Sequence, residues 1–222
     1  MSARMIPLQA IREIVGCGSS GLGAPSKMPC PAYSLPASAC QTGQKLAQVA
    51  GSTCEKCYAM KGNYQFPSVQ STLQRRLASI VDPLWPAAMA TLITQESAAS
   101  GYFRWHDSGD LQSVAHLEAI AEVCRRTPGI RHWLTTREYG YVAAWAQANT
   151  IPENLCIRVS APMIDGDAPK IRTRDGGRLA VSYVHAKADA RGRVCPAPMQ
   201  GNTCGTCRSC WDAGIDVSYH KH

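Results

Sequence analysis

The sequence predicts an α/β fold, either a partial (β/α) barrel or an open parallel sheet, with cysteine-rich segments at both ends. From Gly101 onward, extended apolar segments alternate with amphipathic helical segments, an order typical of parallel βαβ units. Nine of the eleven cysteines lie before residue 60 or after residue 190. A chain of 222 residues, 45% hydrophobic and 18% charged, can form one large core, so we expect a single α/β domain over residues 1–222.

The first 60 residues form a cysteine-rich segment with little periodicity. Gly, Pro, Ser and Cys are frequent there, which indicates loops laid over a framework that forms later in the chain. A short strand around Tyr33–Leu35 is the only extended element expected before residue 60.

Regular elements are expected from residue 67 to residue 185. Helical spacing of apolar residues predicts the helices, and short apolar runs predict the strands between them. The expected helices are 67–80, Pro86–Ala98, 111–124 and Glu138–Ala148, the last one capped by Thr135, and the expected strands are 102–105, 130–135, 155–160 and 179–185. Residues 190–222 then form a Cys-, Gly- and Pro-rich tail that we expect to pack on the same domain.

The N-terminus and the charge pattern narrow the class of protein. Arg4, Arg12 and Glu13 interrupt the apolar residues that a signal peptide would need, and no later stretch is long enough to span a membrane. We therefore expect a cytoplasmic protein with no membrane partner. The net charge of +7 comes from scattered basic residues. Solvated helix faces explain them, and a nucleic-acid surface is an alternative that we do not favour.

The tail cysteines predict a metal site. Cys195, Cys204, Cys207 and Cys210 follow a C-x8-C-x2-C-x2-C pattern, and gaps of two residues let neighbouring thiolates reach one metal centre. Cytosolic thiols are kept reduced, so such a group more often binds metal than forms disulfides. The C-x2-C-x2-C run, with a proline after Cys195, resembles ferredoxin ligation and favours an iron–sulfur cluster over the alternatives, structural zinc and free thiols.

A second group of cysteines lies near the N-terminus. Cys40, Cys54 and Cys57 would leave one iron of a [4Fe-4S] cluster open to water, substrate or a cofactor, which is how metal sites do chemistry. Cys30 is the alternative fourth thiolate, and full cysteine ligation would instead indicate a structural or electron-transfer cluster. The sequence is compatible with either one or two iron–sulfur clusters.

The remaining cysteines are expected to be structural. Cys124 lies on an apolar helical stripe and Cys156 lies in a predicted strand, where a free cysteine is usually a small core residue. Cys17 has no clear assignment. Trp105, Trp133 and Trp211 are also expected to be core residues rather than a stacking platform, and Arg104, Arg137 and Arg158 either bind an anionic substrate or are ion-paired around the sheet.

The segment HDSGD, residues 106–110, follows one predicted strand and precedes a helix. A βα loop at the carboxyl end of a parallel strand is where α/β folds place ligands. His106, Asp107 and Asp110 are therefore the candidate catalytic residues, for proton transfer or ligand orientation. The structural alternative is that Ser108 or Asp110 caps the helix that follows.

Several segments together resemble the bacteriophage gene product 88 family over nearly the whole chain. They are SLPASAC, GSTCEKCYAMKGNYQFPSVQ, FRWHDSGDLQS, HWLTTREY and CPAPMQGNTCGTCRSCW. The family is in turn similar to radical S-adenosylmethionine enzymes, in which a three-cysteine loop follows the first strand of a partial (β/α) barrel.

That resemblance implies roles for particular residues. Cys40, Cys54 and Cys57 would be the cluster ligands with Tyr58 just after them, and S-adenosylmethionine would be the cofactor. Ser108, Gly109 and Asp110 would contact the amino group of its methionine, and the tail would hold an auxiliary cluster. The thirteen residues between Cys40 and Cys54 depart from the C-x3-C-x2-C spacing of those enzymes.

Two functions are consistent with these features. The first is an iron–sulfur enzyme with an open cluster facing a βα-loop pocket and an unknown small-molecule or macromolecular substrate. The second is a non-catalytic iron–sulfur or zinc protein, structural, redox-active or electron-transferring, that binds nucleic acid or a host protein. The number of cysteine ligands on the N-terminal cluster discriminates between the two functions.

Overall fold

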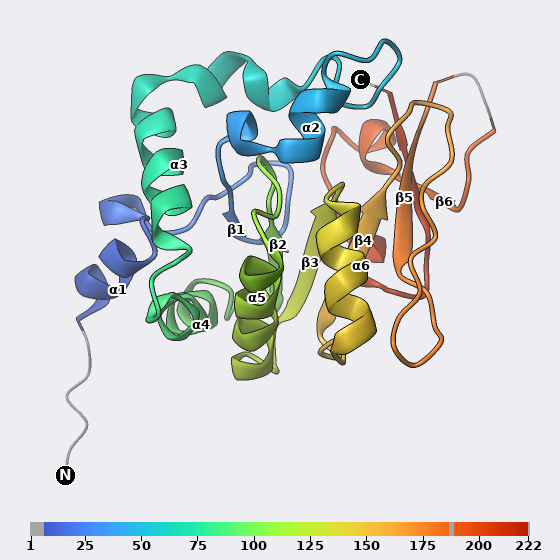
Figure 1. Cartoon of the computed structure of the whole chain (residues 1–222). Coiled ribbons are helices and arrows are strands. Elements are labelled where there is room, and N and C mark those ends of the chain that lie inside the picture. Colours follow the sequence, from blue (N-terminus) through green and yellow to red (C-terminus); the bar gives the residue numbers. More distant parts are fainter. Residues whose placement is uncertain (1–6, 187–188, 222) are drawn as a thin grey trace.

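The structure is a computed structural model that describes residues 7–186 and 189–221. Its centre is one open sheet of seven parallel strands in the order β1-β2-β3-β4-β5-β7-β6 (Figure 1). The strands are β1 (Ala32–Tyr33), β2 (Tyr102–Trp105), β3 (Arg131–Thr136), β4 (Leu155–Ser160), β5 (Ala180–His185), β6 (Arg193–Val194) and β7 (Val217–His220). The α/β prediction is confirmed, and the sheet is the open form of the two that we expected.

The helices agree with the expected periodicity in the middle of the chain. The α-helices are α1 (Leu8–Ile14), α2 (Gln41–Leu46), α3 (Pro67–Ser79), α4 (Trp85–Glu96), α5 (Val114–Arg126) and α6 (Tyr139–Ala148). Helix α5 connects β2 to β3, and α6 connects β3 to β4, so both βαβ units are present. In the described residues no helix is both long and apolar enough to cross a membrane.

Both helix-capping predictions are wrong. Helix α5 is capped by Ser113, whose hydroxyl accepts the N–H of His116 at 3.0 Å, and not by Ser108 or Asp110. Helix α6 has no side-chain cap at its N-cap residue, Glu138, although the adjacent Thr136 hydroxyl accepts the Glu138 N–H. Helix α5 starts at Val114, later than the periodicity suggests, so the residue directly before it supplies the cap.

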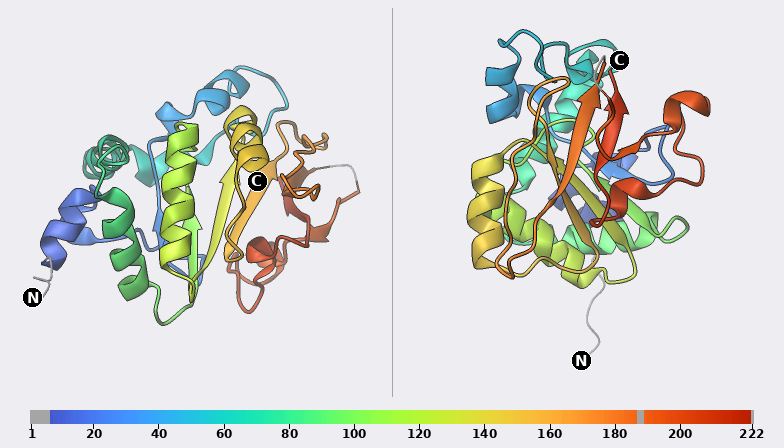
Figure 2. Two further views of the ribbon diagram at one scale, coloured as in Figure 1. Left: turned by 60° about the horizontal axis from the view of Figure 1, so that its bottom comes forward. Right: turned by 90° about the vertical axis from the view of Figure 1, so that its right-hand side faces the viewer.

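One face of the sheet packs against α4, α5 and α6 and forms the main core (Figure 2). The aromatic rings of Trp85 and Trp105 lie 5.9 Å apart there, and Phe103 lies 4.8 Å from Trp105. All three side chains are fully buried. The expectation that Trp105 is a core residue is therefore confirmed.

The opposite face of the sheet is covered by the C-terminal segment (Figure 2). Here Trp133, Trp211 and Cys30 form a second, smaller apolar cluster. The indole N–H of Trp211 donates to the Phe103 carbonyl at 2.9 Å, so the tail is bonded directly to β2. Trp133 and Trp211 are core residues, as expected.

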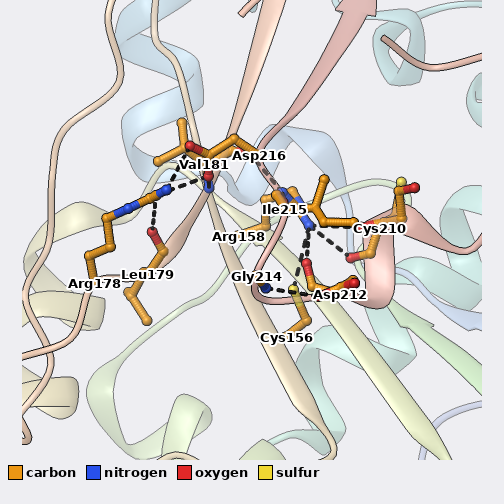
Figure 3. Close-up of polar contacts among 11 residues, drawn as sticks. Cys156, Arg158, Arg178, Leu179, Val181, Cys210, Asp212, Gly214, Ile215 and Asp216 are labelled. Atoms are coloured by element: carbon orange, nitrogen blue, oxygen red, sulfur yellow. Dashed lines mark hydrogen bonds and ion pairs between the residues drawn. The ribbon is translucent and has the colours of Figure 1, made fainter. Parts of the chain in front are cut away.

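Arg158 fastens the tail to this face (Figure 3). Its side chain, on β4, is fully buried. One guanidinium nitrogen donates to the carbonyls of Val181 and Ile215 at 2.8 and 2.7 Å, and the other donates to those of Ser209 and Asp212 at 3.0 and 2.9 Å. The cation is thus held by backbone carbonyls of β5 and the tail rather than by a carboxylate of the described residues.

The expectations of loops before residue 60 and of an aperiodic tail are partly wrong. The helices α1 and α2 form within the first segment, and α1 packs against α4 through Ile11. In the tail, β7 inserts between β5 and β6. These elements are short, and their hydrogen-bond partners lie far away in the sequence, so local periodicity does not reveal them.

Candidate functional site

The loop that carries Cys40, Cys54 and Cys57 lies over the carboxyl ends of the central strands. At its start, the backbone N–H and the hydroxyl of Thr42 both donate to the Glu138 carboxylate at 2.8 Å, just after β3. Near its end, the N–H of Thr53 donates to the Pro162 carbonyl at 2.9 Å, just after β4. Contacts that are distant in sequence therefore fix both ends of this cysteine loop.

Two of the three thiols converge on Gly43. A Cβ atom at Gly43 would lie 3.7 Å from the Cys40 sulfur and 3.8 Å from the Cys54 sulfur. It would also lie 2.8 Å from the Cys40 Cβ, which is closer than real Cβ atoms approach. Only glycine therefore leaves both sulfurs room on this side of α2.

The third thiol belongs to the same group. Cys57 lies near enough to Cys40 and Cys54 for its charge to act on both. Burial, followed by the neighbouring Asp110 carboxylate, raises the pKa of Cys40, and burial also raises the pKa of Cys54 despite the nearby Arg137. The structure thus brings the three candidate ligands together as half-buried thiols.

Tyr58, directly after Cys57, reaches across to the loop that follows β2. Its hydroxyl donates to the Asp107 carbonyl, and the Tyr64 hydroxyl donates to the Asp107 carboxylate at 2.9 Å. The Tyr58 side chain is 58% exposed. The cysteine loop and the 106–110 loop are therefore in direct contact.

Ser108 and Gly109 bind the backbone after β1. The Ser108 hydroxyl donates to the Leu35 carbonyl at 2.7 Å, and the Leu35 N–H donates back to the Ser108 carbonyl at 3.0 Å. Gly109 has a φ of +78°, and an added Cβ would lie 2.5 Å from the Leu35 Cβ. Both residues hold the loop closed on β1, and the Ser108 side chain is buried.

Asp110 is a buried carboxylate that connects two strand ends. Its oxygens accept the N–H of Leu111 at 2.7 Å and that of Arg137 at 2.8 Å. Burial raises its pKa to about 6, against the opposing hydrogen bonds from Thr136 and from those N–H groups. It lies close enough to Cys40 to raise that thiol's pKa, so it belongs to the cysteine site.

His106 packs against the helix layer. Its ring is buried and lies 5.4 Å from the ring of His116 on α5. Burial lowers its pKa well below the usual value, followed by the effects of His116 and Arg104, so the ring is neutral. Neither of its nitrogens has a protein partner among the described residues. The structure therefore separates His106 from Asp107 and Asp110, with which the sequence grouped it.

The four tail cysteines form a second group, on the tail-covered face of the sheet. Cys204 is within electrostatic reach of Cys195 and Cys207, and Cys210 is within reach of Cys195 and Cys204. Burial raises the pKa of Cys210 to about 11, and its sulfur lies 3.2 Å from the Tyr219 hydroxyl. Burial opposes the shift at Cys207, but Ser209 and nearby arginines lower its pKa overall.

Cys30 belongs to the tail group and not to the cysteine loop. It packs in the apolar cluster with Trp133 and Trp211 and is within electrostatic reach of Cys204. The N–H of Cys204 donates to the Lys27 carbonyl at 3.0 Å, which joins the two segments. Cys30 therefore does not stand beside the three cysteines of the loop.

No group of three or more His, Cys, Asp or Glu side chains within residues 7–186 and 189–221 is arranged to hold a single metal ion. A tetrahedral zinc site needs sulfurs about 3.8 Å apart, from a Zn–S length near 2.3 Å. A four-iron cluster spreads its thiolates over separate iron atoms and needs a wider arrangement. Thiols are the donors that iron–sulfur clusters take, and each cysteine group supplies at least three of them.

The other cysteines lie within the core. Cys17 and Cys124 are fully buried, and burial raises the pKa of both thiols. Cys156 is buried on β4, where its sulfur lies 3.7 Å from a guanidinium nitrogen of Arg158. All three stand apart from the two cysteine groups.

Sequence reasoning missed the residues that position the site. Glu138 was expected only as a helix start, yet its buried carboxylate holds the cysteine loop through Thr42. Arg104 was named, but only for an anionic substrate or an ion pair; it lies over Trp133 at 4.6 Å from the ring centre, within electrostatic reach of both Tyr58 and Cys210. The only signal in the sequence was a glutamate, Glu138, close after a predicted strand. That signal does not reveal its partner Thr42, which lies 96 residues away.

Taken together, the fold and the two cysteine groups define an open parallel α/β protein with a cysteine loop at the carboxyl edge of its sheet. The chain matches the Gene product 88 family model over residues 12–213, and it belongs to this family of phage proteins. No curated protein and no solved structure gives a significant match.

Proposed function

We propose that this protein binds two iron–sulfur clusters and is a radical S-adenosylmethionine-like enzyme. In this proposal Cys40, Cys54 and Cys57 hold a [4Fe-4S] cluster with one iron free of cysteine. The tail cysteines hold an auxiliary cluster, and the substrate binds at the carboxyl edge of the sheet.

The observation that carries the proposal is the placement of Cys30. It was the only cysteine that the sequence offered as a fourth ligand for the loop, and it packs with Trp133 and Trp211 on the tail-covered face. Three thiols over the carboxyl ends of the strands support a cluster with an open iron, because α/β folds bind ligands at that edge.

Buried positive charge supports the tail cluster. Arg158 is fully buried near Cys210, and neither it nor Arg104 forms a salt bridge with a carboxylate of the described residues. A buried cation is stable when negative charge or hydrogen-bond acceptors surround it. Metal-bound thiolates would supply that negative charge beside both arginines.

The chain's own residues have defined tasks in this proposal. Glu138 and Pro162 fix the cysteine loop, and Tyr58 closes it against the 106–110 loop. Asp110, with a pKa near 6, holds or releases a proton beside Cys40. When bound, a reduced cluster supplies one electron to a ligand at its open iron.

Iron and sulfide analysis of anaerobically purified protein tests the proposal. We expect about eight irons per chain, from two clusters. The variant Cys54→Ser should lose about half of this iron, and Cys210→Ser should lose the other half. The control Cys124→Ala, a buried cysteine outside both groups, should keep all of it.

Spectroscopy then tests the open iron. Adding S-adenosylmethionine to the reduced protein should change the electron paramagnetic resonance spectrum of the wild type and of Cys210→Ser, but not of Cys54→Ser. Iron that is present but indifferent to S-adenosylmethionine would instead indicate a non-catalytic iron–sulfur protein. Protein without iron, or with bound zinc, would refute the proposal.

A further inference from the structure

A groove of about 530 Å³ lies on the tail-covered face, away from the cysteine loop. Arg131, the first residue of β3, and Arg193 of β6 line it together with Arg208 of the tail. Arg131 starts its strand, so the groove lies toward the amino end of β3, opposite the edge where the cysteine loop sits. Cys207 of the tail group lines it as well, so the groove borders the proposed tail cluster, but the proposed function assigns no role to its arginines.

The guanidinium groups of the groove have no carboxylate partners. Arg131, Arg193 and Arg208 form no salt bridge with any described residue, although five other arginines on this protein do. Arg208 donates instead to the Gly205 and Cys207 carbonyls, at 2.7 and 2.8 Å. Like charges that face one groove without a counter-charge create a positive potential there.

The groove offers neutral hydrogen-bond donors beside the arginines. Gln200, Thr206 and Ser209 line it as well, and Asp212 is its one acidic residue. One Asp212 carboxylate oxygen accepts the N–H of Gly214 at 2.8 Å. Three guanidinium groups therefore face one carboxylate and the Cys207 thiol.

The wall of the groove is preorganised. Arg158 donates to the carbonyls of Ser209, Asp212 and Ile215. All three of these residues line the groove. A buried arginine with several hydrogen bonds holds this stretch of backbone in one arrangement. Less ordering of the wall is then needed when a ligand binds.

We propose that this groove binds phosphate groups. Guanidinium groups pair with phosphate oxygens through two parallel N–H bonds, and amide and hydroxyl donors complete such sites. A volume near 530 Å³ is suitable for a nucleotide-sized ligand. The phosphates come either from a small molecule, such as a nucleoside triphosphate, or from the backbone of a single-stranded nucleic acid.

Isothermal titration calorimetry on the purified, metal-loaded protein tests this site. The probes are inorganic pyrophosphate, ATP and a single-stranded 12-nucleotide DNA, each at 50 mM salt. Wild-type protein should bind at least one probe with a Kd below 1 mM. Arg131→Gln and Arg193→Gln should each weaken binding about tenfold, since each removes one charge-assisted contact.

The control is Arg75→Gln, an exposed arginine on α3 that donates to the Ser71 and Thr72 hydroxyls and has no carboxylate partner among residues 7–186 and 189–221. It should leave the affinity unchanged. Iron content of each variant, measured in parallel, shows whether the tail cluster beside the groove is intact, so a loss of phosphate binding at unchanged iron content is assigned to the arginine itself.

The probes distinguish the source of the phosphate. Tighter binding of the oligonucleotide, with a steep fall as salt rises, indicates nucleic acid, and equal or tighter binding of ATP indicates a small ligand. Either result supports a phosphate site if the two groove variants weaken it. No binding of any probe at 1 mM, or an equal loss in Arg75→Gln, would overturn the proposal.

Discussion

Replacing Arg158 with methionine gives the most direct test of how the tail is held. The guanidinium donates four hydrogen bonds of 2.7 to 3.0 Å to backbone carbonyls of β5, the tail and the turn before β7. Methionine retains much of the side-chain volume but has no donor. The variant Arg158→Met therefore leaves four acceptors without their present partner.

The size of the effect follows from two opposing contributions. Each buried acceptor left unsatisfied costs about 1–3 kcal/mol. Removing the buried charge offsets part of this free-energy cost, because the guanidinium no longer has to be desolvated. The net loss should be roughly 3–5 kcal/mol, which for a chain of this size lowers the Tm by about 6–20 °C.

Urea unfolding followed by circular dichroism measures this loss. The control is Arg126→Met, which removes an exposed ion pair to Glu122 on helix α5 and should cost less than about 0.5 kcal/mol. Arg158→Lys should fall between the two, since an ammonium group keeps the charge but reaches fewer carbonyls. If Arg158→Met unfolds within 1 kcal/mol of the control, the tail is not held by this side chain.

Three other perturbations test separate parts of the structure. Gly109→Ala should cost at least about 2 kcal/mol in urea unfolding, because φ is +78° and the new Cβ would lie 2.5 Å from the Leu35 Cβ; a loss under 0.5 kcal/mol would contradict that close approach. Cys210→Ser should lower both iron content and Tm, whereas the control Cys124→Ala should keep its full iron content. Unchanged iron content and Tm in Cys210→Ser would show that Cys210 is not a ligand. Burial lowers the pKa of His116 to about 4 from an unfolded value near 6.5, so the neutral ring's contribution to stability is complete above pH 6.5 and is lost as pH falls toward 4. His116→Gln should reduce the slope of unfolding free energy against pH in that window by up to about 1.4 kcal/mol per pH unit. An identical slope in the variant would show that the ring titrates normally.

The middle of the chain was well predicted because its signals are local. Helix α3 and strand β4 begin and end within about a residue of where hydrophobic spacing placed them. The alternation from Gly101 to Ser160 gave the parallel βαβ order directly. Each of these elements buries one face or both against neighbours that are close in sequence. The pattern of apolar residues is therefore enough to predict where the element begins and ends.

The candidate sites were predicted only as groups of residue types. The spacing of Cys204, Cys207 and Cys210 implied proximity, since two-residue gaps bring thiols together whatever the fold. Asp110 was singled out from its place after a strand, and the structure does put it beside Cys40. His106, four residues earlier, was grouped with it, yet the left-handed backbone at His106 turns its ring into the helix layer.

The sequence by itself determined the fold class, most of the regular elements and the composition of both cysteine groups, because these depend on periodicity and short spacing. Only the tertiary structure decided that Cys30 joins the tail, that Glu138 holds the cysteine loop and that Arg158 holds the wall of a basic groove. Each of those facts depends on a contact between segments about 50 to 180 residues apart. The free energy of such contacts comes from burial and hydrogen bonding in the folded state, and no local pattern of residues records it.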